Sequence, residues 1–166
     1  MGDRVGRSHS ALAAILLGGF IAGTIDIGAA CLISGRDVIF ILHVIAGGLV
    51  GKAAAFSGGT NTAAIGLLLQ WGMSIIIAAI YVIASRAIPI LARSWLVGGL
   101  IYGAGVFFVM NYVVVPLSAY HHVPSFTPTS FAKNMAAMLL FGVIVAFFAR
   151  ERRLPEWSGE GRVASP

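Results

Sequence analysis

The sequence predicts an all-α membrane protein with four transmembrane helices and one short apolar helix on the outer side. The composition is the first observation that predicts it. Hydrophobic residues make up 58% of the 166 residues and charged residues 10%, whereas a soluble domain is about half apolar and about a quarter charged. The second observation is a set of uncharged segments that reach the roughly 20 residues a helix needs to cross a bilayer. A mean hydropathy of +0.93 agrees with both.

Four segments have the length of a membrane span, and they cover residues 11–33, 62–84, 95–117 and 131–149. Between Asp37 and Lys52 only 14 uncharged residues occur, which is too short for a span. We therefore expect an outer excursion over residues 34–61 that contains a short re-entrant or interfacial helix. The first 153 residues form one transmembrane domain. Residues 154–166 are polar and rich in Gly and Pro, and we expect a disordered cytoplasmic tail.

The positions of the basic residues predict which side of the membrane each end occupies. If the short segment does not span, the basic ends and the basic loop between the second and third spans share one side: Arg4, Arg7, Arg86, Arg93, Arg150, Arg152 and Arg153. The outer loop at residues 120–130 then contains no Lys or Arg. A fifth span would place some of these groups outside, against the positive-inside bias. Both termini are therefore predicted to be cytoplasmic.

Several functional classes find no support in the sequence. The net charge of +5 comes from residues that flank the spans, which argues against a nucleic-acid partner. Cys31 is the only cysteine, so no intrachain disulfide can form. No catalytic motif is present, and Asp26 has no second embedded carboxylate to pair with, so we expect no enzyme. His121 and His122 are adjacent and His43 is isolated, so neither a metal nor a cofactor is expected.

Asp26 is the one acidic residue inside an apolar span, and polar residues of the next two spans lie at a similar depth. Asp26, Gln70 and Asn111 lie six to eight residues below the outer ends of the first three spans, or roughly 9 to 12 Å inside the membrane. The predicted outer excursion adds His43 and Lys52, and Lys52 is the only cation near Asp26. The sequence therefore predicts an intramembrane polar cluster of Asp26, Gln70, Asn111, Lys52 and His43.

Three interpretations of Asp26 remain open. An ionised carboxylate at that depth costs roughly 3 kcal/mol unless it is paired or reached by water. Asp26 can hold the excursion against the helix bundle by pairing with Lys52 or Gln70. It can instead form a proton or cation site that opens outward. It can also contact a ligand or a lipid headgroup, or simply snorkel toward the membrane surface.

Small residues line the predicted spans at helical spacing, which allows helices to approach closely. The helix-packing glycines are Gly19, Gly23, Gly66, Gly99 and Gly103. Together with the lack of a wide polar path, they favour a small non-enzymatic membrane protein. We expect a structural or accessory component that contacts the lipid bilayer and forms a homo-oligomer or joins a larger membrane complex. The alternative is a small proton- or cation-coupled transporter or channel centred on Asp26.

The second half of the chain also resembles a known family. The run YVIASRAIPILARSWLVGGLIYG at residues 81–103, a Pro-containing outer loop and the run NMAAMLLFGVIVAFFARERR at residues 134–153 are similar to YagU-like bacterial inner-membrane proteins. That resemblance implies a first helix, an outer insertion and three further helices. It also implies a location in the bacterial inner membrane. It implies no defined activity and no catalytic residue.

Overall fold

The computed structural model describes residues 2–88, 91, 94–121 and 125–150, and over these ranges the chain is helical without a β-strand. Four helical segments are long and apolar enough to cross a membrane. They are α1 (Gly2–Ser34), α4 (Gly59–Ala87), the continuous segment of α6 (Trp95–Val109), η1 (Met110–Val114) and α7 (Val115–Leu117), and α8 (Pro128–Arg150). Each predicted span falls within one of these segments, so the predicted fold class is confirmed. The predicted tail at 154–166 lies outside the described residues.

The outer excursion contains two short helices, α2 (Val38–Val50) and α3 (Lys52–Ser57). The Asp37 side chain caps α2 by accepting a hydrogen bond of 2.7 Å from the backbone N–H of Phe40. Gly51 separates the helices with a φ of +82°, a conformation that only glycine adopts at little cost. The 13 residues of α2 extend about 20 Å, short of the roughly 30 Å hydrocarbon core.

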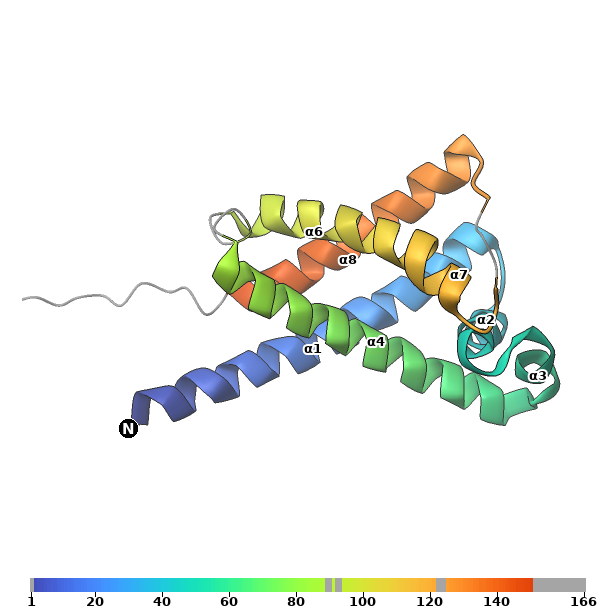
Figure 1. The fold of residues 1–166 in the computed structure, drawn as a ribbon, viewed down its shortest axis with the longest axis horizontal. Helices are drawn as coiled ribbons and strands as arrows, with labels where there is room; N and C mark the ends of the chain where they lie inside the picture. Colours follow the sequence, from blue (N-terminus) through green and yellow to red (C-terminus); the bar gives the residue numbers. More distant parts are fainter. Residues whose placement is uncertain (1, 89–90, 92–93, 122–124, 151–166) are drawn as a thin grey trace, which may run out of the picture.

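Both short helices lie at one end of the bundle. Figure 1 shows α2, α3 and α7 at the end where α1 finishes and α4 begins, whereas the start of α1 lies at the opposite end. The backbone N–H of Ala119, just after α7, donates a 2.9 Å hydrogen bond to the carbonyl of Gly48 in α2. The excursion therefore leaves and returns at the same end of the bundle, and the described residues contain four candidate membrane spans.

Neighbouring helices pack as an open series. Helix α6 packs along α8, α8 along α1, and α1 along α4, which leaves α4 and α6 as the two end members. These two meet where the Tyr102 hydroxyl donates a 2.6 Å hydrogen bond to the carbonyl of Ile77. The rings of Tyr81 and Tyr102 also make an edge contact at 5.0 Å between centroids. Beyond this contact α4 and α6 diverge (Figure 1).

The five glycines named from the sequence all lie where one helix approaches another within the chain. A Cβ added at Gly19 would come 2.7 Å from the Cα of Ile75 on α4, and one at Gly99 would come 2.8 Å from the Cα of Val143 on α8. The other close approaches are those of Gly23 to Ser74, Gly66 to the backbone of Leu42, and Gly103 to Leu139. The small-residue faces are therefore occupied by packing inside one chain.

Candidate functional site

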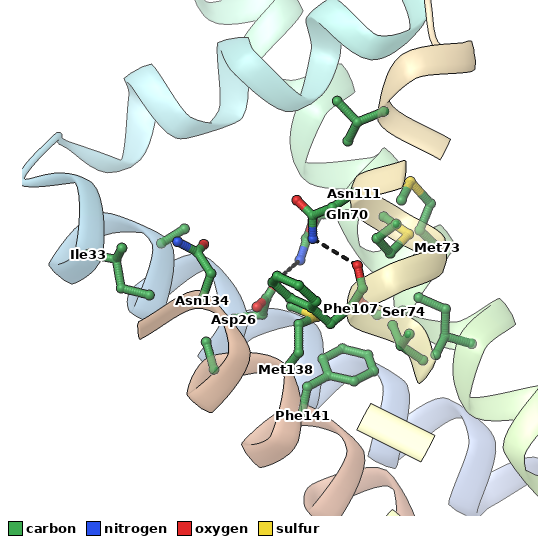
Figure 2. Close-up of a pocket in the computed structure, with 16 residues that line it drawn as sticks. Asp26, Ile33, Gln70, Met73, Ser74, Phe107, Asn111, Asn134, Met138 and Phe141 are labelled. Atoms are coloured by element: carbon green, nitrogen blue, oxygen red, sulfur yellow. Dashed lines mark hydrogen bonds between the residues drawn. The ribbon is translucent and has the colours of Figure 1, made fainter. Parts of the chain in front are cut away.

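A pocket of about 200 Å³ lies between the diverging helices α4 and α6, with α1 and α8 completing its wall. Its polar lining comes from all four long segments: Asp26, Gln70, Ser74, Asn111 and Asn134. Figure 2 shows the Gln70 side chain directed at Asp26 and the amide of Asn111 turned back to the carbonyl of Phe107. Three of the five predicted cluster residues, Asp26, Gln70 and Asn111, therefore line one pocket.

The centre of the site is a hydrogen bond between α1 and α4. Gln70 Nε2 donates to Asp26 Oδ2 at 2.9 Å and to the carbonyl of Gly23 at 3.4 Å. The amide of Gln70 reaches the α1 backbone because Gly23 has no side chain, and a Cβ there would come 2.9 Å from the Cβ of Ser74. Asp26 is half-buried and Gln70 is buried. The carboxylate thus has a neutral amide as its partner.

Of the two pairings that the sequence left open for Asp26, the structure forms the one with Gln70 and not the one with Lys52. Lys52 is exposed at the start of α3, where its Nζ lies 6.0 Å from the centre of the Tyr120 ring. Within the described part of the chain, no cation lies within ion-pair distance of Asp26. The reason is geometric, because the turn at Gly51 holds α3 at the end of the bundle while Asp26 lies eight residues, about 12 Å, before the end of α1.

His43 also lies apart from the pocket. Its Nε2 lies 2.9 Å from the carbonyl of Gly59, and its ring centre lies 5.5 Å from that of Phe56. Since a carbonyl only accepts, Nε2 carries the proton in this bond. His43 is buried and fastens α2 to the start of α4. Lys52 and His43 are therefore corrected from members of the polar cluster to residues of the excursion.

Two further polar residues line the pocket that the sequence analysis did not include. Asn134 lies on α8, and its Nδ2 donates to the carbonyl of Ser130 at 2.8 Å and to its hydroxyl at 3.3 Å. Ser74 on α4 is 2% exposed, and its hydroxyl makes no hydrogen bond with any residue that the structure describes. Depth in the sequence does not identify Asn134, because it lies only three residues below the outer end of the predicted fourth span, whereas the predicted cluster lies six to eight residues below.

Asn111 lies in a distorted part of its helix. In η1 the backbone N–H of Val115 donates to the carbonyl of Met110, five residues earlier, which is the π-helical pattern. Pro116 follows directly and has no N–H to continue the regular ladder. The side chain of Asn111 donates a 2.9 Å hydrogen bond to the carbonyl of Phe107. One N–H of its Nδ2 is thus occupied, while its other N–H and its Oδ1 have no partner over residues 2–88, 91, 94–121 and 125–150.

The remaining wall is apolar and includes thioethers and aromatic rings. Met73, Met110 and Met138 line it from α4, η1 and α8. The rings of Phe107 and Phe141 are buried on α6 and α8. Among the described residues no group of three His, Cys, Asp or Glu side chains is placed to hold a metal ion. The pocket therefore combines a single carboxylate with neutral polar groups and an apolar wall.

These features define a small helical protein with four candidate membrane spans and one acidic residue facing an internal pocket. Comparison with family models, with curated proteins and with solved structures gave no match.

Proposed function

We propose that the protein is a small, non-enzymatic membrane protein that binds a proton or a cation at Asp26 and moves it across the membrane. One observation carries this proposal. The carboxylate of Asp26 faces a pocket and accepts from the neutral amide of Gln70, so no described residue compensates its negative charge. An acidic residue placed in this way inside a membrane span is a feature of ion and proton pathways.

The closed end of the pocket supports transport over a purely structural role. Toward the start of α6, the pocket ends at Ile77, whose carbonyl accepts from Tyr102, and at Phe141. Phe141 belongs to a buried cluster with Tyr81. Because these contacts close the pocket toward the start of α6, alternating access would require α4 and α6 to separate at Tyr102 to release the cation.

A structural or accessory role in a larger assembly is the second candidate function. Among the described long segments the series is open, with α4 and α6 at its two ends, and α2 also packs against α4. At most 28% of the most apolar window of each span is buried, and the rest is available to lipid or to another helix. A homo-oligomer or a partner subunit could close the series. The helix-packing glycines do not support this role, because they pack against other helices of the same chain and are not free to contact a partner.

We also propose that the protein lies in a bacterial inner membrane with both termini in the cytoplasm. The support is the position of the Arg residues in the sequence, which flank the ends of the spans opposite the predicted excursion, together with the resemblance to YagU-like proteins. Reporter fusions after Arg93 and after Pro166 should both read cytoplasmic, and a fusion at Ser125 should read periplasmic. A periplasmic reading at Pro166 would contradict this orientation.

Reconstituted protein tests the two functional candidates against each other. Proteoliposomes that contain the wild-type protein should show proton flux, either by itself or driven by a cation gradient, when a pH-sensitive dye is used. Asp26→Asn should abolish this flux. Asp37→Asn is the matched control, because Asp37 is exposed and asparagine also caps helices. Loss of assembly in Asp26→Asn, with no flux in the wild type, would favour the accessory role.

A further inference from the structure

We infer that the ligand of the Asp26 pocket is a protonated organic amine, that is, an ammonium group attached to an apolar body. This inference rests on the proposed function and names the class of cation. It follows from the hydrogen-bonding state of the pocket's amides, from the number of its charges and from the chemistry of its apolar wall.

The amide groups of the pocket present more free acceptors than free donors. Gln70 Nε2 donates to the Asp26 carboxylate and to the carbonyl of Gly23. Asn134 Nδ2 donates to the carbonyl and to the hydroxyl of Ser130. One N–H of Asn111 Nδ2 donates to the carbonyl of Phe107, and its second N–H has no acceptor among the described residues. Because a backbone carbonyl can only accept, these bonds assign the nitrogen of each amide. The three amide oxygens have no donor among the described residues.

An acceptor-rich pocket is complementary to a ligand that donates several hydrogen bonds. An ammonium group has up to three N–H donors and no acceptor. The single carboxylate of Asp26 matches one positive charge, and hydrogen bonds to a charged partner are the stronger kind. The hydroxyl of Ser74, which is without a partner in the described structure, can accept one more donor.

The apolar wall distinguishes an organic cation from a metal ion. Alkali and alkaline-earth cations favour carboxylate, carbonyl and water oxygens, and the thioethers of Met73, Met110 and Met138 do not suit them. The side chains of Phe107 and Phe141 belong to the apolar wall against which the body of an organic cation can pack. A pocket of about 200 Å³ has roughly the volume of six or seven waters, which exceeds the size of a dehydrated ion.

Binding of radiolabelled 2-phenylethylammonium to the purified protein in nanodiscs tests this inference. The wild type should bind it saturably. Asp26→Asn should weaken binding about tenfold or more, since a hydrogen bond to a charged group is lost. Asn111→Leu removes one acceptor and should weaken binding about threefold to tenfold. Asp37→Asn, whose carboxylate caps α2 outside the pocket, should bind as the wild type does.

Two measurements need no variant, so misfolding of a mutant cannot obscure the result. Neutral 2-phenylethanol, which keeps the apolar body and lacks the charge, should not displace the labelled amine from the wild type. Sodium chloride should displace it no better than choline chloride at the same ionic strength. Displacement by 2-phenylethanol, selective displacement by sodium, or equal binding to Asp26→Asn would each overturn the inference.

The outcomes also separate this inference from the proposed function. If the amine does not bind while proteoliposomes still show flux that depends on Asp26, the ligand class is wrong and the proposed function stands. If the amine does not bind and no flux depends on Asp26, both fall. Saturable binding that requires Asp26, without any flux, would support the ligand class and overturn transport.

Discussion

The hydrogen bond between Gln70 and Asp26 should couple the two residues strongly in a double-mutant cycle. The change is Gln70→Met, Asp26→Leu and both together, since each replacement keeps the approximate shape and removes the polar atoms. Gln70 Nε2 donates at 2.9 Å to the carboxylate and at 3.4 Å to the carbonyl of Gly23. The first bond has a charged acceptor, and such bonds contribute about 1.5 to 3 kcal/mol.

The two single variants should differ in a way that the geometry sets. Gln70→Met leaves the half-buried carboxylate without its donor, and we expect a loss of about 2 to 3 kcal/mol in the free energy of unfolding. Asp26→Leu leaves a neutral amide that still reaches the carbonyl of Gly23. It also removes an acidic residue from an apolar span, so we expect a change of less than about 1 kcal/mol. The double variant should resemble Asp26→Leu.

The assay is denaturant unfolding in mixed detergent micelles, which reports the free energy of each variant. We expect a coupling energy of about 2 kcal/mol between Gln70 and Asp26. The matched control combines Asp26→Leu with Lys52→Met. Lys52 is exposed and far from the pocket, so its change should stay within about 0.5 kcal/mol and add to that of Asp26. Additive effects of Gln70 and Asp26 would refute the hydrogen bond as the link between α1 and α4.

Two further substitutions test the packing and the closed end of the pocket. Gly66→Ala should destabilise the protein by about 1 to 3 kcal/mol, because its Cβ would collide with the backbone of Leu42; Gly72→Ala on the same helix, with nothing within 4 Å, should be neutral or stabilising in the same unfolding assay. Tyr102→Phe removes the hydrogen bond to the carbonyl of Ile77 and should lower stability by about 1 kcal/mol while raising flux in proteoliposomes; unchanged flux would contradict a gate at this contact.

Comparison of Asp26 with Lys52 shows which parts of the site the sequence could predict. The shared depth of Asp26, Gln70 and Asn111 follows from counting residues from the span ends, and the structure places all three on one pocket. The possible pairing of Asp26 with Lys52 was wrong, because the position of Lys52 depends on the direction of the chain after Gly51. A single positive φ sets that direction, and neither hydropathy nor charge reports it.

Ser74 and Asn134 show a second limit on what the sequence can predict about the pocket. Both are visible in the sequence, but the face that each presents depends on how its helix is rotated against its neighbours. Both donors of Gln70 and of Asn134 and one donor of Asn111 are used by specific carbonyl, carboxylate and hydroxyl groups. The resulting excess of acceptors exists only once the helices are in place.

The sequence by itself determined the number of spans, their approximate bounds and the presence of one acidic residue among them. These properties are local, because a chain in the apolar core of a membrane must satisfy its backbone hydrogen bonds within each helix. Tertiary structure decided the partner of Asp26, the open arrangement of α4 and α6, and the composition of the pocket. Those features depend on close packing between helices distant in the sequence, where the absence of a side chain at Gly23 or Gly66 sets which surfaces can meet.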